Sequence, residues 1–207
     1  MKSNGLIKWG ALAVAIVLPL VFAARSPLLE WRDPIYILAG FAGVIGLALL
    51  LVQPLLIAGT LPGVPSQKTH TWTGFALILA VIIHVAGLWI TSPPDVVDVL
   101  LFRSPTPFSI WGALAMWAVF AAGLLAIARR KLSQRRWRIA HTLAAATTII
   151  GTVVHAWYVQ GTMEVLSKGM LCLLVIGASV WALRRRRAWR LFSRSKGPAA
   201  RNSSDQF

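Results

Sequence analysis

Residues 70–91 read HTWTGFALILAVIIHVAGLWIT, a run of apolar residues that contains two histidines, His70 and His84. A helix of this length, at 1.5 Å per residue, spans the roughly 30 Å hydrocarbon core of a bilayer. The two histidines are 14 residues apart. In a helix this spacing corresponds to about 1400°, or roughly 40° short of four full turns. The histidines therefore share one helix face and lie about 21 Å apart along its axis.

A second run repeats this arrangement. Residues 138–160 read RIAHTLAAATTIIGTVVHAWYVQ, with His141 and His155 again 14 residues apart. These two pairs are all four histidines of the chain. Two helices with the same spacing can present their histidines to each other at two depths in a membrane.

The composition is typical of an integral membrane protein. Hydrophobic residues make up 57% of the 207 residues and charged residues 13%, which is about half the charged share of a typical soluble domain. The apolar residues form runs of the length that bilayer-spanning helices require. We predict an all-α bundle of six transmembrane helices at residues 6–24, 35–58, 70–91, 108–128, 138–160 and 165–183.

The basic residues indicate the orientation of this bundle. The net charge is +15, and 17 of the 21 Lys and Arg lie in segments on the same side as the N-terminus. Five of the six acidic residues lie in loops on the other side. Because cytoplasmic segments are enriched in Lys and Arg, we predict cytoplasmic N- and C-termini in a multi-pass protein of the cell inner membrane. Topology and contact with membrane lipid account for the basic charge, which argues against a nucleic-acid partner.

The sequence divides into three segments. We expect residues 1–34 to hold the first helix and an outer loop, residues 35–185 the main transmembrane domain, and residues 186–207 a basic cytoplasmic tail. The first apolar run is somewhat long for a cleavable signal peptide, so we expect it to be retained. In the longest outer loop, 96–102 is expected to form a short surface helix, and 195–207 to be disordered.

The four histidines differ in how strongly each indicates a function. His84 and His155 fall deep inside their predicted spans, where an ionisable residue is costly and is a functional candidate by default. His70 and His141 lie near predicted cytoplasmic ends, where an interfacial histidine is ordinary. For each histidine taken alone, a purely structural role in hydrogen bonding between helices stays open.

The pairing is more specific than the single residues. In the predicted topology the third and fifth helices run in the same direction, which puts His70 level with His141 and His84 level with His155. Neutral imidazole is a common axial ligand of heme iron, and two such ligands leave no open position for a gas. We therefore expect heme between these helices, most simply two hemes, with one heme as the alternative.

Two further features bound the chemistry. The chain has a single cysteine, Cys172, and no Cys-x-x-Cys-His motif, so a heme would be bound non-covalently as heme b. Residues 186–207 are too few for a flavin or nicotinamide domain, so we expect the electron donor to be another molecule. Gly40, Gly43 and Gly46 lie in an apolar helix and indicate close helix packing rather than a dinucleotide site.

Small residues accompany three of the histidines. Three glycines each lie three or four residues from a histidine, on the same helix face. They are Gly74, Gly87 and Gly151. A glycine at such a position would leave room for a flat macrocycle, and close packing between helices explains the glycines equally well.

Cations near the cytoplasmic side suit the carboxylates that heme carries, because arginine can bond both carboxylate oxygens. The candidates are Arg136 and Arg138, with Arg135 and Lys68 nearby, and Arg103 or Lys168 on the outer side. The enrichment of cytoplasmic segments in basic residues explains the first four without a heme.

With these residues the chain resembles the ferric reductase-like transmembrane domain family. The resemblance rests on Gly74 followed ten residues later by His84, on the segment WRIAH that ends at His141 after a basic loop, and on His155 farther along that helix. The family includes the membrane domains of ferric reductases and NADPH oxidases. It also includes the heme-binding membrane subunit of the bacterial periplasmic methionine sulfoxide reductase system. Six spans without an attached flavin domain look most like that subunit.

The resemblance covers roughly residues 35–185 and has two departures. The usual pattern of the methionine sulfoxide reductase subunit lacks a counterpart of His70, and it spaces the histidines of the fifth helix one residue closer. The full set of four histidines is more similar to the two-heme oxidases and ferric reductases.

These features predict a b-type cytochrome that passes electrons across the membrane as a component of an oxidoreductase. The donor is expected to be a cytoplasmic flavoprotein that docks on the basic segment 129–138, or a membrane quinol. The acceptor is expected to be a periplasmic oxidoreductase, ferric iron or oxygen.

Two other interpretations stay open. In the first, the chain reduces ferric chelates directly and is an enzyme in its own right. In the second, it is a non-redox membrane protein with structural histidines. A transporter is disfavoured because the spans show neither paired broken helices nor intramembrane carboxylates.

Overall fold

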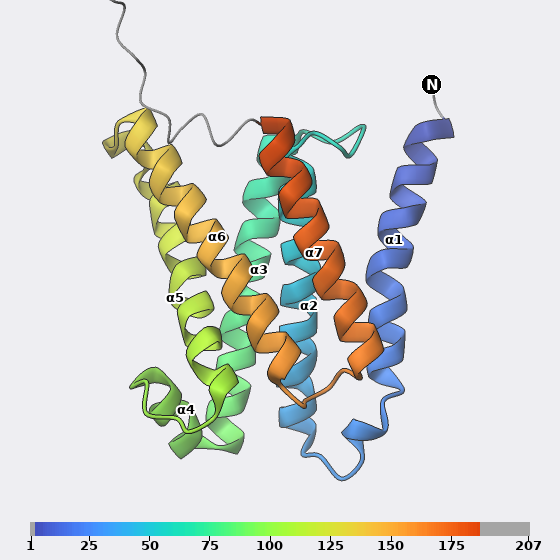
Figure 1. Ribbon diagram of the computed structural model, residues 1–207, viewed down its shortest axis with the longest axis vertical. Coiled ribbons are helices and arrows are strands. Elements are labelled where there is room, and N and C mark those ends of the chain that lie inside the picture. Colours follow the sequence, from blue (N-terminus) through green and yellow to red (C-terminus); the bar gives the residue numbers. More distant parts are fainter. Residues whose placement is uncertain (1–2, 187–207) are drawn as a thin grey trace, which may run out of the picture.

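The computed structural model describes residues 3–186, and all regular secondary structure in this range is helical (Figure 1). Six helices are long and one is short. The helices are α1 (Ser3–Ala24), α2 (Pro34–Ile57), α3 (Ser66–Thr91), α4 (Pro93–Leu100), α5 (Pro107–Ile127), α6 (Gln134–Tyr158) and α7 (Val165–Arg186). Two 3-10 turns, η1 (Pro27–Leu29) and η2 (Ala128–Lys131), lie between α1 and α2 and between α5 and α6.

The six long helices are each long and apolar enough to cross a membrane. For the described residues, this confirms the prediction of an all-α protein with six helices able to span a membrane. The predicted basic tail at 186–207, apart from its first residue, and the predicted disorder at 195–207 lie outside the described residues.

The ends of the helices follow from local chemistry. Asp33 precedes α2, and its carboxylate accepts a hydrogen bond from the backbone N–H of Ile35 at 2.7 Å. Pro34 occupies the first turn, where its missing N–H costs no hydrogen bond. The short helix expected in the loop after α3 is also present, but it spans Pro93–Leu100 rather than 96–102. It ends before Phe102, whose φ of 57° is incompatible with a right-handed helix.

Helices α3 and α6 begin four residues earlier than predicted, at Ser66 and Gln134. Hydropathy marks only the part of a helix that suits hydrocarbon, whereas backbone hydrogen bonding continues into the polar residues that precede it. The basic residues Arg135 and Arg136 therefore lie in the first turn of α6 rather than in a loop.

The helices are arranged around two antiparallel hairpins. Helix α2 packs along α3, and α5 packs along α6, while α7 lies against α2 and α1 lies against α7. Helices α3 and α6 run in the same direction, as predicted, and make few backbone contacts with each other (Figure 1). The start of α1 and the end of α7 lie at the same end of the bundle (Figure 1).

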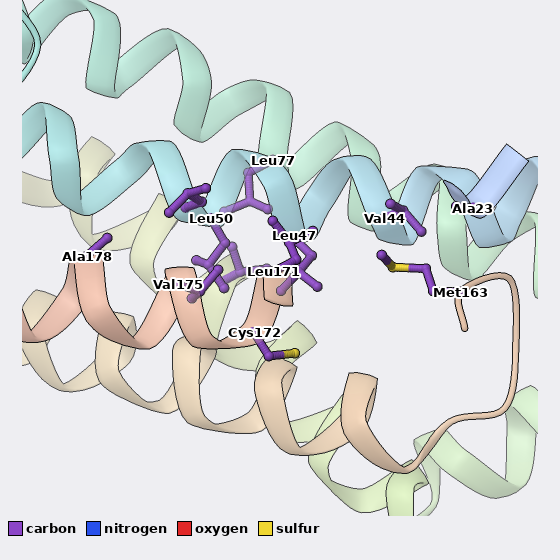
Figure 2. Packing of buried hydrophobic residues seen from close by; sticks show 12 residues of the cluster. Ala23, Val44, Leu47, Leu50, Leu77, Met163, Leu171, Cys172, Val175 and Ala178 are labelled. Carbon is purple, nitrogen blue, oxygen red and sulfur yellow. The ribbon is translucent and has the colours of Figure 1, made fainter. Parts of the chain in front are cut away.

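The apolar core lies mainly between α2, α3 and α7. Leu47 and Leu50 of α2 pack with Leu77 of α3 and with Leu171 and Val175 of α7 (Figure 2). None of the four histidines belongs to this cluster. The core thus packs α7 against the α2–α3 hairpin, and the four histidines of α3 and α6 lie outside it.

Candidate functional site

The structure brings the four histidines together as two facing pairs. The ring centres of His70 and His141 are 6.4 Å apart, with their planes inclined by 74°. The ring centres of His84 and His155 are also 6.4 Å apart, with planes inclined by 80°. These are the pairs expected from the equal spacing and the parallel run of α3 and α6. We call His70 and His141 the inner pair, and His84 and His155 the outer pair.

The separation within each pair matches the reach of a shared metal centre. Two imidazoles on opposite sides of one metal ion place their ring centres about 6 Å apart, because each metal–nitrogen bond is about 2 Å long and each ring centre lies about 1.1 Å behind its nitrogen. Both observed separations, 6.4 Å, are close to this value. At this separation the two imidazoles of a pair are close enough to bind one metal ion together.

Backbone carbonyls of neighbouring helices hold the outer pair. Nδ1 of His84 lies 2.8 Å from the carbonyl oxygen of Ala39 on α2. Nδ1 of His155 lies 3.0 Å from the carbonyl oxygen of Phe108 on α5. A carbonyl oxygen can only accept a hydrogen bond, so both Nδ1 atoms carry the proton in the neutral ring. Nε2 of each ring then keeps the lone pair that a metal requires.

A glycine lies against each outer imidazole. A Cβ on Gly43 of α2 would come within 3.0 Å of Nδ1 of His84, and a Cβ on Gly112 of α5 within 2.7 Å of Nδ1 of His155. From the sequence, a packing role is expected for Gly43, and no role is expected for Gly112. The position of Gly43 in the series of small residues on α2 was the available signal, and Gly112 had none.

The inner pair has a different environment. Nδ1 of His70 and Nδ1 of His141 are buried and have no hydrogen-bond partner among the described residues. Gln53 of α2 is buried beside His70, and its amide Nε2 donates to the hydroxyl of Thr73 at 3.1 Å and to the carbonyl of His70 at 3.4 Å. The amide therefore holds the backbone of α3 at this level, rather than the imidazole itself.

Trp137 supports the other inner imidazole. The indole ring stacks on the ring of His141, with centres 5.3 Å apart and planes inclined by 14°. Its Nε1 donates to the carbonyl of Leu125 at 2.9 Å, and the guanidinium of Arg129 lies 4.8 Å from the centre of the indole. Trp137 thus ties His141 to α5 and to the basic turn that joins the two helices.

The three glycines noted in the sequence lie within the hairpins. A Cβ on Gly87 would lie 2.7 Å from Cβ of Ala39, and a Cβ on Gly151 would lie 2.8 Å from the carbonyl oxygen of Trp111. Both glycines face the neighbouring helix of their own hairpin, as the packing interpretation predicts. Gly74 faces the amide of Gln53. These contacts bring α2 and α5 close enough for their carbonyls to reach the outer imidazoles.

The predicted cations are at the same end of the bundle as the inner pair. Arg136 and Arg138 are exposed in the first turns of α6, as is Arg135, and Lys68 is exposed in the first turn of α3. Arg138 lies three residues before His141 and so on the same side of α6. At the other end, Arg103 is exposed, whereas Lys168 is buried. The ammonium of Lys168 donates to the carbonyl of Val159 at 2.8 Å, across the turn between α6 and α7.

Comparisons of this chain with protein families, with curated proteins and with solved structures gave no match.

Proposed function

We propose that this chain is a b-type cytochrome that passes electrons across the cell inner membrane through two hemes bound between α3 and α6. The observation that carries the proposal is the pair of imidazole pairs, each with ring centres 6.4 Å apart. His70 and His141 would ligate the inner heme, and His84 and His155 the outer heme.

The donor set of each site fits a heme better than a bare metal ion. Within residues 3–186 no three His, Cys, Asp or Glu side chains gather to hold a metal ion. Each histidine pair therefore offers two ligands, and a metal at either site needs its remaining ligands from a bound group. A porphyrin would supply these remaining nitrogen ligands, and the two imidazoles of each pair would hold its iron.

Different parts of the chain would contribute to heme binding in different ways. The histidines provide neutral nitrogen ligands, α2 and α5 hold the outer rings, and the apolar helices exclude water. When bound, heme supplies reversible one-electron chemistry, while the protein supplies ligation and spacing. The two levels, about 21 Å apart along the helices, divide the membrane crossing into shorter steps.

Charge supports a direction for the transfer. Both described ends of the chain, the exposed basic segment 129–138 and the inner pair lie at one end of the bundle. We assign this end to the cytoplasm, because cytoplasmic segments are enriched in Lys and Arg. Electrons then enter near His70 and His141 and leave near His84 and His155.

The donor and acceptor are proposed from the same layout. A cytoplasmic flavoprotein docking on the basic segment 129–138, or a membrane quinol, would reduce the inner heme. A periplasmic oxidoreductase, ferric iron or oxygen would accept electrons at the outer end. The four-histidine pattern supports membership of the ferric reductase-like transmembrane domain family, which remains part of the proposal.

Heme content tests the proposal directly. We expect the purified full-length protein to show the reduced-minus-oxidised absorbance bands of low-spin heme b, with two hemes per chain in a pyridine hemochrome assay. Ser179→Ala serves as a control, because it removes a buried hydroxyl of α7 that bonds only to its own helix. We expect that variant to keep both hemes. A monodisperse, helical protein that holds no heme after expression with sufficient heme supply would refute the proposal.

A further inference from the structure

Each outer imidazole contacts a carbonyl and a glycine of the neighbouring helix, and the two residues have the same spacing in both helices. In each case the acceptor carbonyl belongs to residue i, and a glycine occupies residue i+4. Ala39 and Gly43 form this arrangement on α2, and Phe108 and Gly112 form it on α5. In an α-helix the carbonyl of residue i lies beside residue i+4, because the two are joined by a backbone hydrogen bond. The glycine therefore opens the helix surface where the imidazole has to approach.

The distances show why a side chain would not fit at these positions. A Cβ on Gly112 would lie 2.7, 2.9 and 3.2 Å from three atoms of the His155 ring. A Cβ on Gly43 would lie 3.0 and 3.2 Å from the two nearest atoms of the His84 ring. Either methyl group would push the imidazole away from the carbonyl that fixes its Nδ1 proton. The hydrogen bond of His155 therefore depends on glycine, whereas the ring of His84 would have to move by only a few tenths of an ångström.

The inner pair lacks this arrangement. The backbone carbonyls of Gln53 and Ala122 interact with the inner imidazoles, but these contacts fall outside hydrogen-bond geometry at Nδ1. The residues four positions later are Ile57 and Ala126 rather than glycine. Neither inner Nδ1 has a hydrogen-bond partner among the described residues. The tautomer of the inner rings is accordingly less restrained than that of the outer rings, and of the two inner rings only His141 is held in orientation, by the stacked indole of Trp137.

We propose that Gly43 and Gly112 are positioning residues for heme, and that the outer pair is the tighter of the two heme sites. This inference rests on the proposed function. A hydrogen bond at Nδ1 fixes the ring with its Nε2 lone pair exposed and increases the basicity of the ligand. The outer rings are thus preorganised to bind iron, whereas the inner rings lose conformational freedom when they bind. Heme fills the outer site first and leaves the inner site first.

The test measures heme loss from each site separately. In a His70→Ala protein only the outer heme remains, and in a His84→Ala protein only the inner heme remains. Heme transfer to excess apomyoglobin, followed by absorbance, gives the rate of loss from each. We expect the inner heme of His84→Ala to leave faster than the outer heme of His70→Ala. The reverse order would overturn the proposed ranking of the sites.

Glycine substitutions then test the positioning role. In the His70→Ala background, Gly112→Ala is expected to accelerate heme loss by about 10- to 100-fold, the usual effect of removing a partner of a ligating histidine. Gly43→Ala, with the longer distances, should have a smaller effect. Gly46→Ala is the matched control on α2, because its Cβ would meet Leu77 at an ordinary 3.7 Å. In the His84→Ala background none of the three is expected to change the rate.

The outcomes separate this inference from the proposed function. Retained heme with unchanged loss rates in Gly112→Ala and Gly43→Ala would overturn the inference alone, as would equal acceleration in Gly46→Ala. Retention of the inner heme in the His84→Ala background shows that each glycine variant is folded. Should Gly112→Ala misfold, the milder Gly43→Ala decides. A wild-type protein without heme would refute the proposed function and the inference together.

Discussion

The hairpins α2–α3 and α5–α6 carry the same histidine spacing, but they support their histidines by the same means only at the outer end. There, each hairpin uses a carbonyl and a glycine of its first helix to hold the imidazole of its second. At the inner end the α2–α3 hairpin uses the amide of Gln53 to hold the backbone of α3. The α5–α6 hairpin instead stacks Trp137 on His141. The backbone thus supplies equivalent support in both hairpins, whereas side chains supply support that differs between them.

The largest expected effect distinguishes pairing across the hairpins from pairing within one. A protein with His84→Ala and His155→Ala loses both ligands of a single site, so we expect it to retain one heme per chain. A protein with His84→Ala and His141→Ala loses one ligand from each site, so we expect it to retain none. Pyridine hemochrome assays on the two double variants give the counts. Equal heme content in the two proteins would contradict pairing between α3 and α6.

The single variant His70→Ala tests whether the α2–α3 hairpin carries two ligands or one. We expect heme content to fall from two per chain to about one, with the remaining heme low-spin, because removing an axial ligand releases the inner heme. Reduced-minus-oxidised spectra and heme quantification measure this change. Unchanged heme content would show that only the outer pair binds heme.

A smaller effect is expected from the aromatic support on α6. Trp137→Leu removes the stack on His141 and the hydrogen bond to Leu125. An aromatic pair contributes about 0.5–1.5 kcal/mol, so we expect heme loss from the inner site to be roughly 2- to 12-fold faster. The measurement is heme transfer from a His84→Ala background. Trp117→Leu, an exposed tryptophan of α5 that packs on Phe120, is the control and should leave the rate unchanged.

The smallest effect is expected from Gln53→Leu on α2. This change removes the hydrogen bonds to Thr73 and to the carbonyl of His70. Side-chain hydrogen bonds between membrane helices contribute about 0.6 kcal/mol on average, so we expect a loss of stability near that value. Unfolding in mixed micelles with increasing detergent denaturant measures it. A loss of several kcal/mol would mean that Gln53 supports far more than these two bonds.

The fold was largely predictable because membrane helices follow from composition. The six spans and the parallel run of the third and fifth helices followed from apolar runs and from the distribution of Lys and Arg. Hydropathy alone predicts the starts of α3 and α6 four residues too late, because the polar residues 66–69 and 134–137 continue these helices outside the apolar runs. The short outer helix was expected, but its bounds were shifted.

The histidine pairs were predictable from spacing, while the groups that hold them were not. Histidines are visible in the sequence, so equal spacing on two parallel helices was enough to predict which rings would face each other. The carbonyls of Ala39 and Phe108 belong to the backbone, which every residue has, and so left no mark in the sequence. Gly112 is an isolated glycine in an apolar helix, and its contact with His155 depends on how closely α5 approaches α6.

The fixed protons of the outer rings bear on how membrane voltage affects the protein. Under the proposed function, Nδ1 of each outer ring is committed to a carbonyl and Nε2 would be committed to iron, so neither ring could relay a proton. The six long helices contain no Asp or Glu. Under the proposed function, each electron crosses without a compensating proton and moves a net charge. Such a movement changes in free energy by about 2.3 kcal/mol for every 100 mV across the membrane. A membrane that is negative inside would therefore favour outward transfer, and turnover in vesicles should rise or fall with the imposed potential.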